Sequence, residues 1–236
     1  MQAIFKSALA LAACAGIAAA TQAQAPAPPP PPPDGPRYVA TYVEVMPTAA
    51  AEGLKLVRQF RDATRKEPGN LRAEALQRLG QLHHFVLLEA WKDQAAVDAH
   101  FKGAAAAQFR DKIGAIRNAP VDDRIHFPLS VGPLPVKAGP AAVAVVTHVD
   151  VIPPQRENGT AFTKQLAEES RNEKGNLRFE AVTQVNRQNH FTVIEVWPHR
   201  KAVDVHSMAP HTRAFRDKLA PATGALYDER FYKFVN

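Results

Sequence analysis

Residues 65–74 read RKEPGNLRAE and residues 171–180 read RNEKGNLRFE, so nearly the same ten letters occur twice, 106 positions apart. The same offset relates many other identical residues, including Pro47/Pro153, Phe85/Phe191, Asp98/Asp204, Phe109/Phe215 and Arg124/Arg230. Pairing residues 37–130 with the residues 106 positions later leaves about 30 of 94 positions identical, with no gap. Agreement on this scale indicates a tandem duplication of one structural unit.

We place the first unit at residues 37–130 and the second at residues 142–236. The segment between them, residues 131–141, reads VGPLPVKAGPA and is rich in proline and glycine, as is typical of a linker.

Both units predict the same order of elements. Residues 38–46 alternate in polarity and are rich in Val and Tyr, which favours a strand. Leu56 and Phe60 are four apart and fall on one helix face. The first unit is predicted to contain, in order, a strand at 38–46, a helix at 49–66, strands at 70–77 and 83–91, a helix at 93–117 and a strand at 122–129.

This β-α-β-β-α-β order predicts an α+β fold of two ferredoxin-like units. Helices cover one face of such a sheet and leave the other face apolar. We therefore expect the two copies to cover each other within one chain.

The N-terminus predicts export. Residues 1–23 carry one charge, Lys6, before an alanine-rich apolar run, which is the layout of a signal peptide. Residues 24–36 are proline-rich and predict a stiff spacer. We expect a periplasmic or secreted protein. A lipobox-like LAAC ending at Cys14 leaves a lipoprotein anchored at that cysteine as the alternative.

Composition excludes some classes of function. The net charge is +6, but basic and acidic residues are interleaved without a basic run, which argues against nucleic-acid binding. Cys14 is the single cysteine, so a mature chain without it has no disulfide, thiolate nucleophile or cysteine metal site.

The runs EPGNLRAE, HHFVLLEAWKDQAAVDAHF and FRDK resemble the antibiotic-biosynthesis-monooxygenase family, which includes quinol-type monooxygenases, and the second copy resembles it more closely. The ordered set Gly-x-Leu-x-x-Glu, Glu-x-Trp, Asp-x-His and Phe carries the resemblance over both units. It implies a dimeric α+β barrel, here formed within one chain. It also implies oxygenation without flavin, haem or metal, on a small aromatic or quinol-like substrate that gives electrons directly to O₂.

Alternation places Glu89 and Trp91 on one face of the strand 83–91, and Glu195 and Trp197 are their equivalents. Either Trp is a candidate to stack on a substrate, with core packing as the alternative. Burial among apolar neighbours is expected to raise the pKa of either Glu and make it a candidate base. The alternative for each Glu is a structural salt bridge to a nearby Arg.

His100 and His206 come nine residues after each Trp and face inward on a predicted helix. A neutral imidazole there is a candidate to take a phenolic proton. The alternative is a hydrogen-bonded core histidine.

The two copies differ at positions where the second matches the usual family pattern. Phe179 and His211 of the second copy stand where the first has Ala73 and Ala105. Neutral drift explains these differences equally well. If only one pocket works, we expect the second, surrounded by His206, His211, Trp197 and Phe179, with the first unit mainly a scaffold.

We predict no metal site. His83 and His84 are adjacent in one predicted strand, so their side chains should point apart. His206 and His211 are five apart with Pro210 between them.

The sequence thus favours a cofactor-independent monooxygenase. A barrel that binds a small hydrophobic ligand without chemistry and an isomerase on the same fold remain alternatives, because a fold does not fix a reaction. Self-association beyond the intrachain pair stays open.

Overall fold

Each repeated stretch begins where a helix ends and continues into a strand. The computed structural model describes residues 35–134 and 138–235. In the first repeat the helix ends at Thr64, and Gly69 then turns the chain with φ of 84°. In the second repeat Gly175 does the same with φ of 94°. This left-handed conformation suits glycine, which has no Cβ to clash with the backbone.

The elements follow the predicted order in both repeats. The first contains β1 (Arg37–Glu44), η1 (Pro47–Ala49), α1 (Ala50–Thr64), β2 (Asn70–Arg78), β3 (His84–Trp91), α2 (Gln94–Lys102), α3 (Ala104–Ile116) and β4 (Asp122–Ser130). The second contains β5 (Val143–Asp150), η2 (Pro153–Gln155), α4 (Arg156–Ser170), β6 (Arg178–Gln184), β7 (His190–Trp197), α5 (Arg200–Ser207), α6 (Pro210–Leu219), η3 (Ala220–Ala222) and β8 (Asp228–Phe234).

One prediction differs from the structure. The helix expected over 93–117 is two helices, because Gly103 adopts an extended backbone with ψ of 156° between α2 and α3. In the second repeat Ala209 is extended and Pro210 opens α6. Proline suits the first turn of a helix, where its missing N–H is not needed.

The eight strands close into one antiparallel barrel in the order β1-β3-β2-β8-β5-β7-β6-β4. Each repeat supplies four neighbouring strands, and the two sheets join where β2 pairs with β8 and β4 pairs with β6. The prediction of two ferredoxin-like units forming an intrachain α+β barrel is therefore confirmed.

The repeated Arg-x-Glu residues form two ion pairs between the repeats inside this barrel. Arg72 donates to both oxygens of Glu180 at 2.7 Å, and Arg178 donates to both oxygens of Glu74 at 2.9 and 2.7 Å. Burial raises the pKa of Glu74, but the Arg178 guanidinium outweighs burial and the pKa lies below its usual value. Each repeat thus supplies one arginine and one glutamate to ion pairs with the other repeat across the barrel interior.

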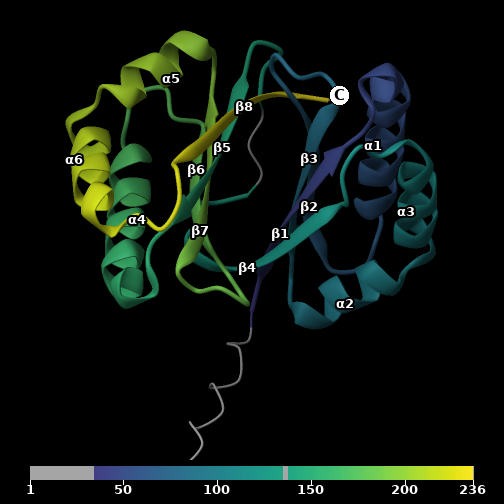
Figure 1. Ribbon diagram of the computed structural model, residues 1–236, viewed down its shortest axis with the longest axis horizontal. Helices are drawn as coiled ribbons and strands as arrows, with labels where there is room; N and C mark the ends of the chain where they lie inside the picture. The colour runs from purple at the N-terminus through teal and green to yellow at the C-terminus, as the bar shows by residue number, and fades with distance from the viewer. Residues whose placement is uncertain (1–34, 135–137, 236) are drawn as a thin grey trace, which may run out of the picture. The chain divides into compact units, whose positions relative to one another are not determined.

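Helices cover the outer face of each half of the barrel (Figure 1). α1 packs on β2 and β3, and α4 packs on β6 and β7. Gly53 and Gly159 permit this close approach, because a Cβ at either position would lie 2.9 or 2.8 Å from a methyl group of Val45 or Val151. A separate apolar cluster lies on the opposite face of the strands and includes Leu76, Leu88 and Ile194.

Several predictions fall outside the described residues. They are the signal peptide at 1–23, all of the spacer at 24–36 except its last two residues, and the middle of the linker at 131–141. Among the residues that the structure describes, no helix is both long enough and apolar enough to cross a membrane.

Candidate functional site

The second repeat holds a chain of four polar side chains between its sheet and its helices. Glu173 Oε1 lies 2.5 Å from His206 Nδ1, and His206 Nε2 lies 3.6 Å from Glu195 Oε2. The same Glu195 oxygen accepts a hydrogen bond of 2.8 Å from Trp197 Nε1. The imidazole is therefore placed between two carboxylates.

Three different elements position these side chains. Glu195 and Trp197 are two apart in β7 and share the face that packs against the helices. His206 lies in the last turn of α5 and stacks on the Trp197 ring at a centroid distance of 4.8 Å. Glu173 belongs to the repeated stretch, in the turn that follows α4.

The first repeat builds the same chain. His100 Nδ1 lies 2.8 Å from Glu67 Oε2, and His100 Nε2 lies 3.5 Å from Glu89 Oε2. Trp91 Nε1 donates to that oxygen of Glu89 at 2.9 Å. The glutamate that both copies of the opening stretch share, Glu67 or Glu173, therefore contacts the buried histidine of its own repeat.

Burial sets the protonation of the inner carboxylates. Desolvation raises the pKa of Glu195 to about 8 and that of Glu89 to about 7, with the Trp N–H bonds acting in the opposite direction. Burial also lowers the pKa of His206, although Glu173 partly opposes it. At neutral pH the centre of the second site is therefore mainly a protonated Glu195 facing an uncharged His206.

The second repeat adds side chains that the first lacks. His211 Nε2 lies 2.8 Å from the same Glu173 oxygen that contacts His206. The Phe179 ring meets the His206 ring edge-on at 5.4 Å. The first repeat has Ala105 and Ala73 at these two positions. The Glu173 carboxylate thus connects two imidazoles in one repeat only.

An open hollow of about 770 Å³ lies next to this cluster, and Tyr227 connects the two. Tyr227 lines the hollow and packs against the core that contains Trp197 and Phe179. Burial and then the charge of Glu195 raise the pKa of Tyr227. The first repeat has Val121 at the equivalent position.

The hollow also presents charged groups. Arg216 lies on its wall, 3.3 Å from Glu229 and with its guanidinium 5.3 Å from the centre of the Tyr227 ring. Neither His206 nor Glu195 is among the lining residues, and their exposed fractions are only 4% and 3%. A ligand in the hollow meets Tyr227 and Arg216 before it meets the buried carboxylate.

The structure brings the predicted residues together in two groups. His206, His211, Glu195, Trp197 and Phe179 form one cluster. His100, Glu89 and Trp91 form the matching cluster of the first repeat, without an added histidine. The inner glutamates contact His and Trp rather than the Arg that the sequence suggested as a salt-bridge partner.

Sequence reasoning missed four contributors. Glu67 and Glu173 carried a usable signal, because both stand in the stretch that the copies share. Arg216 is also kept in both copies, as Arg110, whereas Tyr227 has no counterpart that would draw attention to it.

The expectation that the side chains of His83 and His84 point apart is wrong. His83 lies in the turn before β3, so strand alternation does not apply to it, and the two rings are 4.4 Å apart. Glu44, His83 and His84 can each offer a ligand atom within 4.8 Å of the others, and so can Glu173, His206 and His211.

Comparison with known proteins adds a family and a fold. The family model described as "Antibiotic biosynthesis monooxygenase" matches residues 36–112 and again residues 142–218. The Bacillus subtilis (strain 168) protein named "Putative monooxygenase YcnE" is 32% identical over 81 residues, which cover 34% of this chain and 85% of that protein. Tyr227 and Glu229 lie outside both matched ranges.

Two solved structures share the fold across both repeats. A "putative monooxygenase" from Fusobacterium nucleatum has a TM-score of 0.76 and 17% identity, over 86% of this chain and 93% of its own. Another from Lactobacillus acidophilus NCFM has a TM-score of 0.70 and 17% identity, over 86% and 95%. At this identity both comparisons concern the fold alone.

Proposed function

Because the chain belongs to the antibiotic biosynthesis monooxygenase family, we propose that it is a cofactor-independent monooxygenase of quinol-like or polycyclic aromatic molecules, working in its second repeat. The observation that carries this proposal is the asymmetry between the copies. The second repeat has the hollow beside Tyr227, and the buried Glu195–His206 pair behind it. The first repeat keeps the Glu–His–Glu–Trp chain but has Val121 and Ala105 where the second has Tyr227 and His211.

The proposed oxygenation requires two groups from the protein: a base that removes the phenolic proton and a cation that stabilises the phenolate. A hydroquinone that loses a phenolic proton becomes electron-rich enough to reduce O₂. One oxygen atom enters the ring and the other leaves as water, so hydroquinone plus O₂ gives hydroxyquinone plus water. Arg216 on the wall of the hollow is placed to stabilise the phenolate, since a guanidinium attracts an oxyanion strongly in a partly dry site.

The buried pair supplies the proton acceptor: the protonated Glu195 passes its proton to Nε2 of His206 and takes up the substrate's proton in its place. With an N–H on Nδ1 bonded to Glu173, the His206 ring turns its lone pair at Nε2 towards Glu195. The separation of 3.6 Å is too long for a hydrogen bond, and a small movement closes it. A proton from the substrate reaches this pair past Tyr227, which lies between the hollow and the buried core.

The test is oxygen uptake by the purified protein with a panel of hydroquinones and anthrones, after subtraction of autoxidation. Products formed under ¹⁸O₂ are weighed by mass spectrometry. The proposal expects uptake above autoxidation and one labelled oxygen atom per product. Conversion without a gain in mass indicates an isomerase instead.

A specific observation favours a second candidate, a barrel that binds an aromatic ligand without chemistry. The Glu–His–Glu–Trp chain occurs in both repeats, and its inner members are almost fully buried, as a purely structural network would be. This candidate predicts uptake no faster than autoxidation, together with ligand-dependent increases in the unfolding temperature.

We further propose that the protein acts outside the cytoplasm, on the strength of the signal-like sequence of residues 1–23. The mass of the N-terminal peptide from the native host tests this. Cleavage after Ala23 supports export, a lipid on Cys14 supports the anchored form, and an uncleaved Met1 contradicts both.

A further inference from the structure

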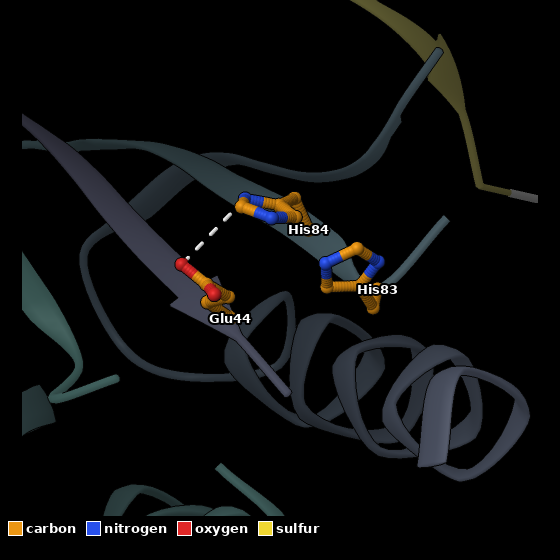
Figure 2. Close-up of side chains that lie close together, drawn as sticks. All are labelled: Glu44, His83 and His84. Atoms are coloured by element: carbon orange, nitrogen blue, oxygen red, sulfur yellow. Dashed lines mark ion pairs between the residues drawn. The ribbon is translucent and has the colours of Figure 1, made fainter. Parts of the chain in front are cut away.

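Three potential metal ligands meet at one end of the first repeat (Figure 2). Glu44 is the last residue of β1, and it stands directly opposite His84, the first residue of β3. His83 immediately precedes that strand and turns its ring towards the same place. One carboxylate oxygen and one nitrogen from each ring lie within 4.8 Å of one another.

The backbone that carries these side chains is fixed. The amide of Val45 donates to the carbonyl of His83 at 3.0 Å, and the amide of Asn118 donates to the carbonyl of Glu44 at 2.9 Å. Asn118 Nδ2 also donates to Glu44 Oε1 at 2.5 Å, which leaves Oε2 for another partner. Outer hydrogen bonds of this kind orient the ligands of metal sites.

The ligand atoms themselves are available. His84 Nδ1 is 3.9 Å from Glu44 Oε2, which is beyond hydrogen-bond distance, and within the described residues neither imidazole is held in a hydrogen bond. All three side chains are half-buried, and a cation can reach them from solvent.

The ligand types select the kind of cation. Two imidazoles and one carboxylate suit zinc and similar transition metals, whereas calcium and magnesium require mostly oxygen ligands. Zinc–nitrogen bonds of about 2.0–2.1 Å in a tetrahedral site imply ligand atoms about 3.3 Å apart. The side chains must therefore close in slightly from the present limit of 4.8 Å, which partly exposed side chains on a fixed backbone can do.

The second repeat keeps a carboxylate and one of the two histidines at this place, but it has asparagine where the first repeat has His83. Asp150, Asn189 and His190 stand at the equivalent positions. Asn189 donates to the carbonyl of Val151 at 2.7 Å, and His190 Nδ1 lies 3.2 Å from His148 Nε2. Its polar atoms are thus engaged with one another, and asparagine at the His83 position is evidently compatible with the fold.

The other cluster of two histidines and a glutamate is a weaker candidate. In the cluster of Glu173, His206 and His211, one glutamate oxygen already contacts both rings at 2.5 and 2.8 Å. A cation there would have to break both contacts, and the cluster belongs to the site already described.

We propose that Glu44, His83 and His84 form a zinc-type metal site on the first repeat, separate from the oxygenase site of the second. The one remaining position of the tetrahedron is open to water. The site does not depend on the proposed oxygenase activity, because it shares no residue with the second cluster.

The experiment is a Zn²⁺ titration of the untagged protein in competition with a chromogenic chelator. We compare the wild type with His83→Asn, which copies the second repeat, and with His211→Ala, which copies the first. The expected result is one tight site per chain in the wild type and in His211→Ala. His83→Asn is expected to bind Zn²⁺ at least about tenfold more weakly.

The unfolding temperature is the second measurement, and it also checks that each variant is folded. Excess Zn²⁺ should raise the unfolding temperature of the wild type, because a ligand that binds only the folded state stabilises it. His83→Asn should unfold at the wild-type temperature without metal and gain little from Zn²⁺. Equal Zn²⁺ affinity in wild type and His83→Asn overturns the proposal, as does loss of the tight site in His211→Ala.

Discussion

Arg72 of the first repeat and Glu180 of the second are joined by two hydrogen bonds of 2.7 Å inside the barrel, where their side chains are 4% and 0% exposed. Arg178 and Glu74 repeat the arrangement with the roles of the copies exchanged. The two copies of one ten-letter stretch thus hold each other, which answers why the chain carries it twice.

We expect Arg72→Leu to lower the free energy of unfolding by about 3 kcal/mol, because it leaves the buried carboxylate of Glu180 without its bidentate partner. The double variant Arg72→Leu/Glu180→Leu should recover part of that loss, since it removes the unpaired charge. Urea unfolding of both variants measures this. The exposed pair of Arg200 and Asp204 is the control, and Arg200→Ala should change stability by less than about 0.5 kcal/mol. An Arg72→Leu variant as stable as that control would contradict the role given to the buried pair.

Replacing the turn glycine by alanine is predicted to lower the free energy of unfolding by different amounts in the two copies. Alanine at either Gly69 or Gly175 must adopt a left-handed backbone, at a cost of about 1–2 kcal/mol. A Cβ on Gly69 would also lie 2.8 Å from the Ala96 Cβ, whereas nothing lies within 4 Å of a Cβ on Gly175. Gly69→Ala should therefore be the more destabilising by about 1 kcal/mol or more. Urea midpoints that coincide for the two variants would show that this contact relaxes without cost.

The pKa of Glu195 predicts how stability changes with pH. Its folded pKa of about 8 lies above its ordinary value of 4.5, so the folded state holds more protons between these values. Stability is then lost as the pH rises towards 8, by at most about 1.4 kcal/mol per pH unit. Glu195→Gln should lose less stability than the wild type between pH 5 and 8. The control is Glu157→Gln, whose parent side chain is 90% exposed, and it should follow the wild-type curve. Parallel curves for Glu195→Gln and the wild type would mean that Glu195 ionises normally.

His211 is predicted to act by positioning. Its charge lowers the pKa of His206 and its Nε2 shares Glu173, so His211→Ala should raise the pKa of His206. We expect kcat to fall about tenfold and the acidic limb of the pH–rate profile to move to higher pH. The first repeat folds with Ala105 at this position, which makes the substitution structurally mild. A lower kcat with an unchanged pH profile would assign His211 a purely structural role.

The element order and the inward faces could be predicted from the sequence because they depend on local periodicity. Alternation placed Glu89 beside Trp91, and helical spacing turned His100 towards the core. The repeat itself predicted that two sheets would share one barrel.

Contacts between distant segments could not be predicted in the same way. Periodicity shows which face a residue occupies but not which strand lies opposite, so the pairing of Arg72 with Glu180 was invisible. His83 was misplaced because one residue beyond a strand end the alternation no longer holds. The break at Gly103 was missed because a single glycine is compatible with a continuous helix.

The most direct test of the central claim compares Glu195→Gln with Glu89→Gln, two equivalent and equally buried carboxylates. The measurement is the rate of ¹⁸O incorporation into a quinol product that the wild type forms, with folding of both variants checked by circular dichroism. We predict that Glu195→Gln loses at least about 100-fold in kcat, while Glu89→Gln keeps the wild-type rate. Equal losses in both variants, or wild-type rates in both, would contradict a single oxygenase site in the second repeat.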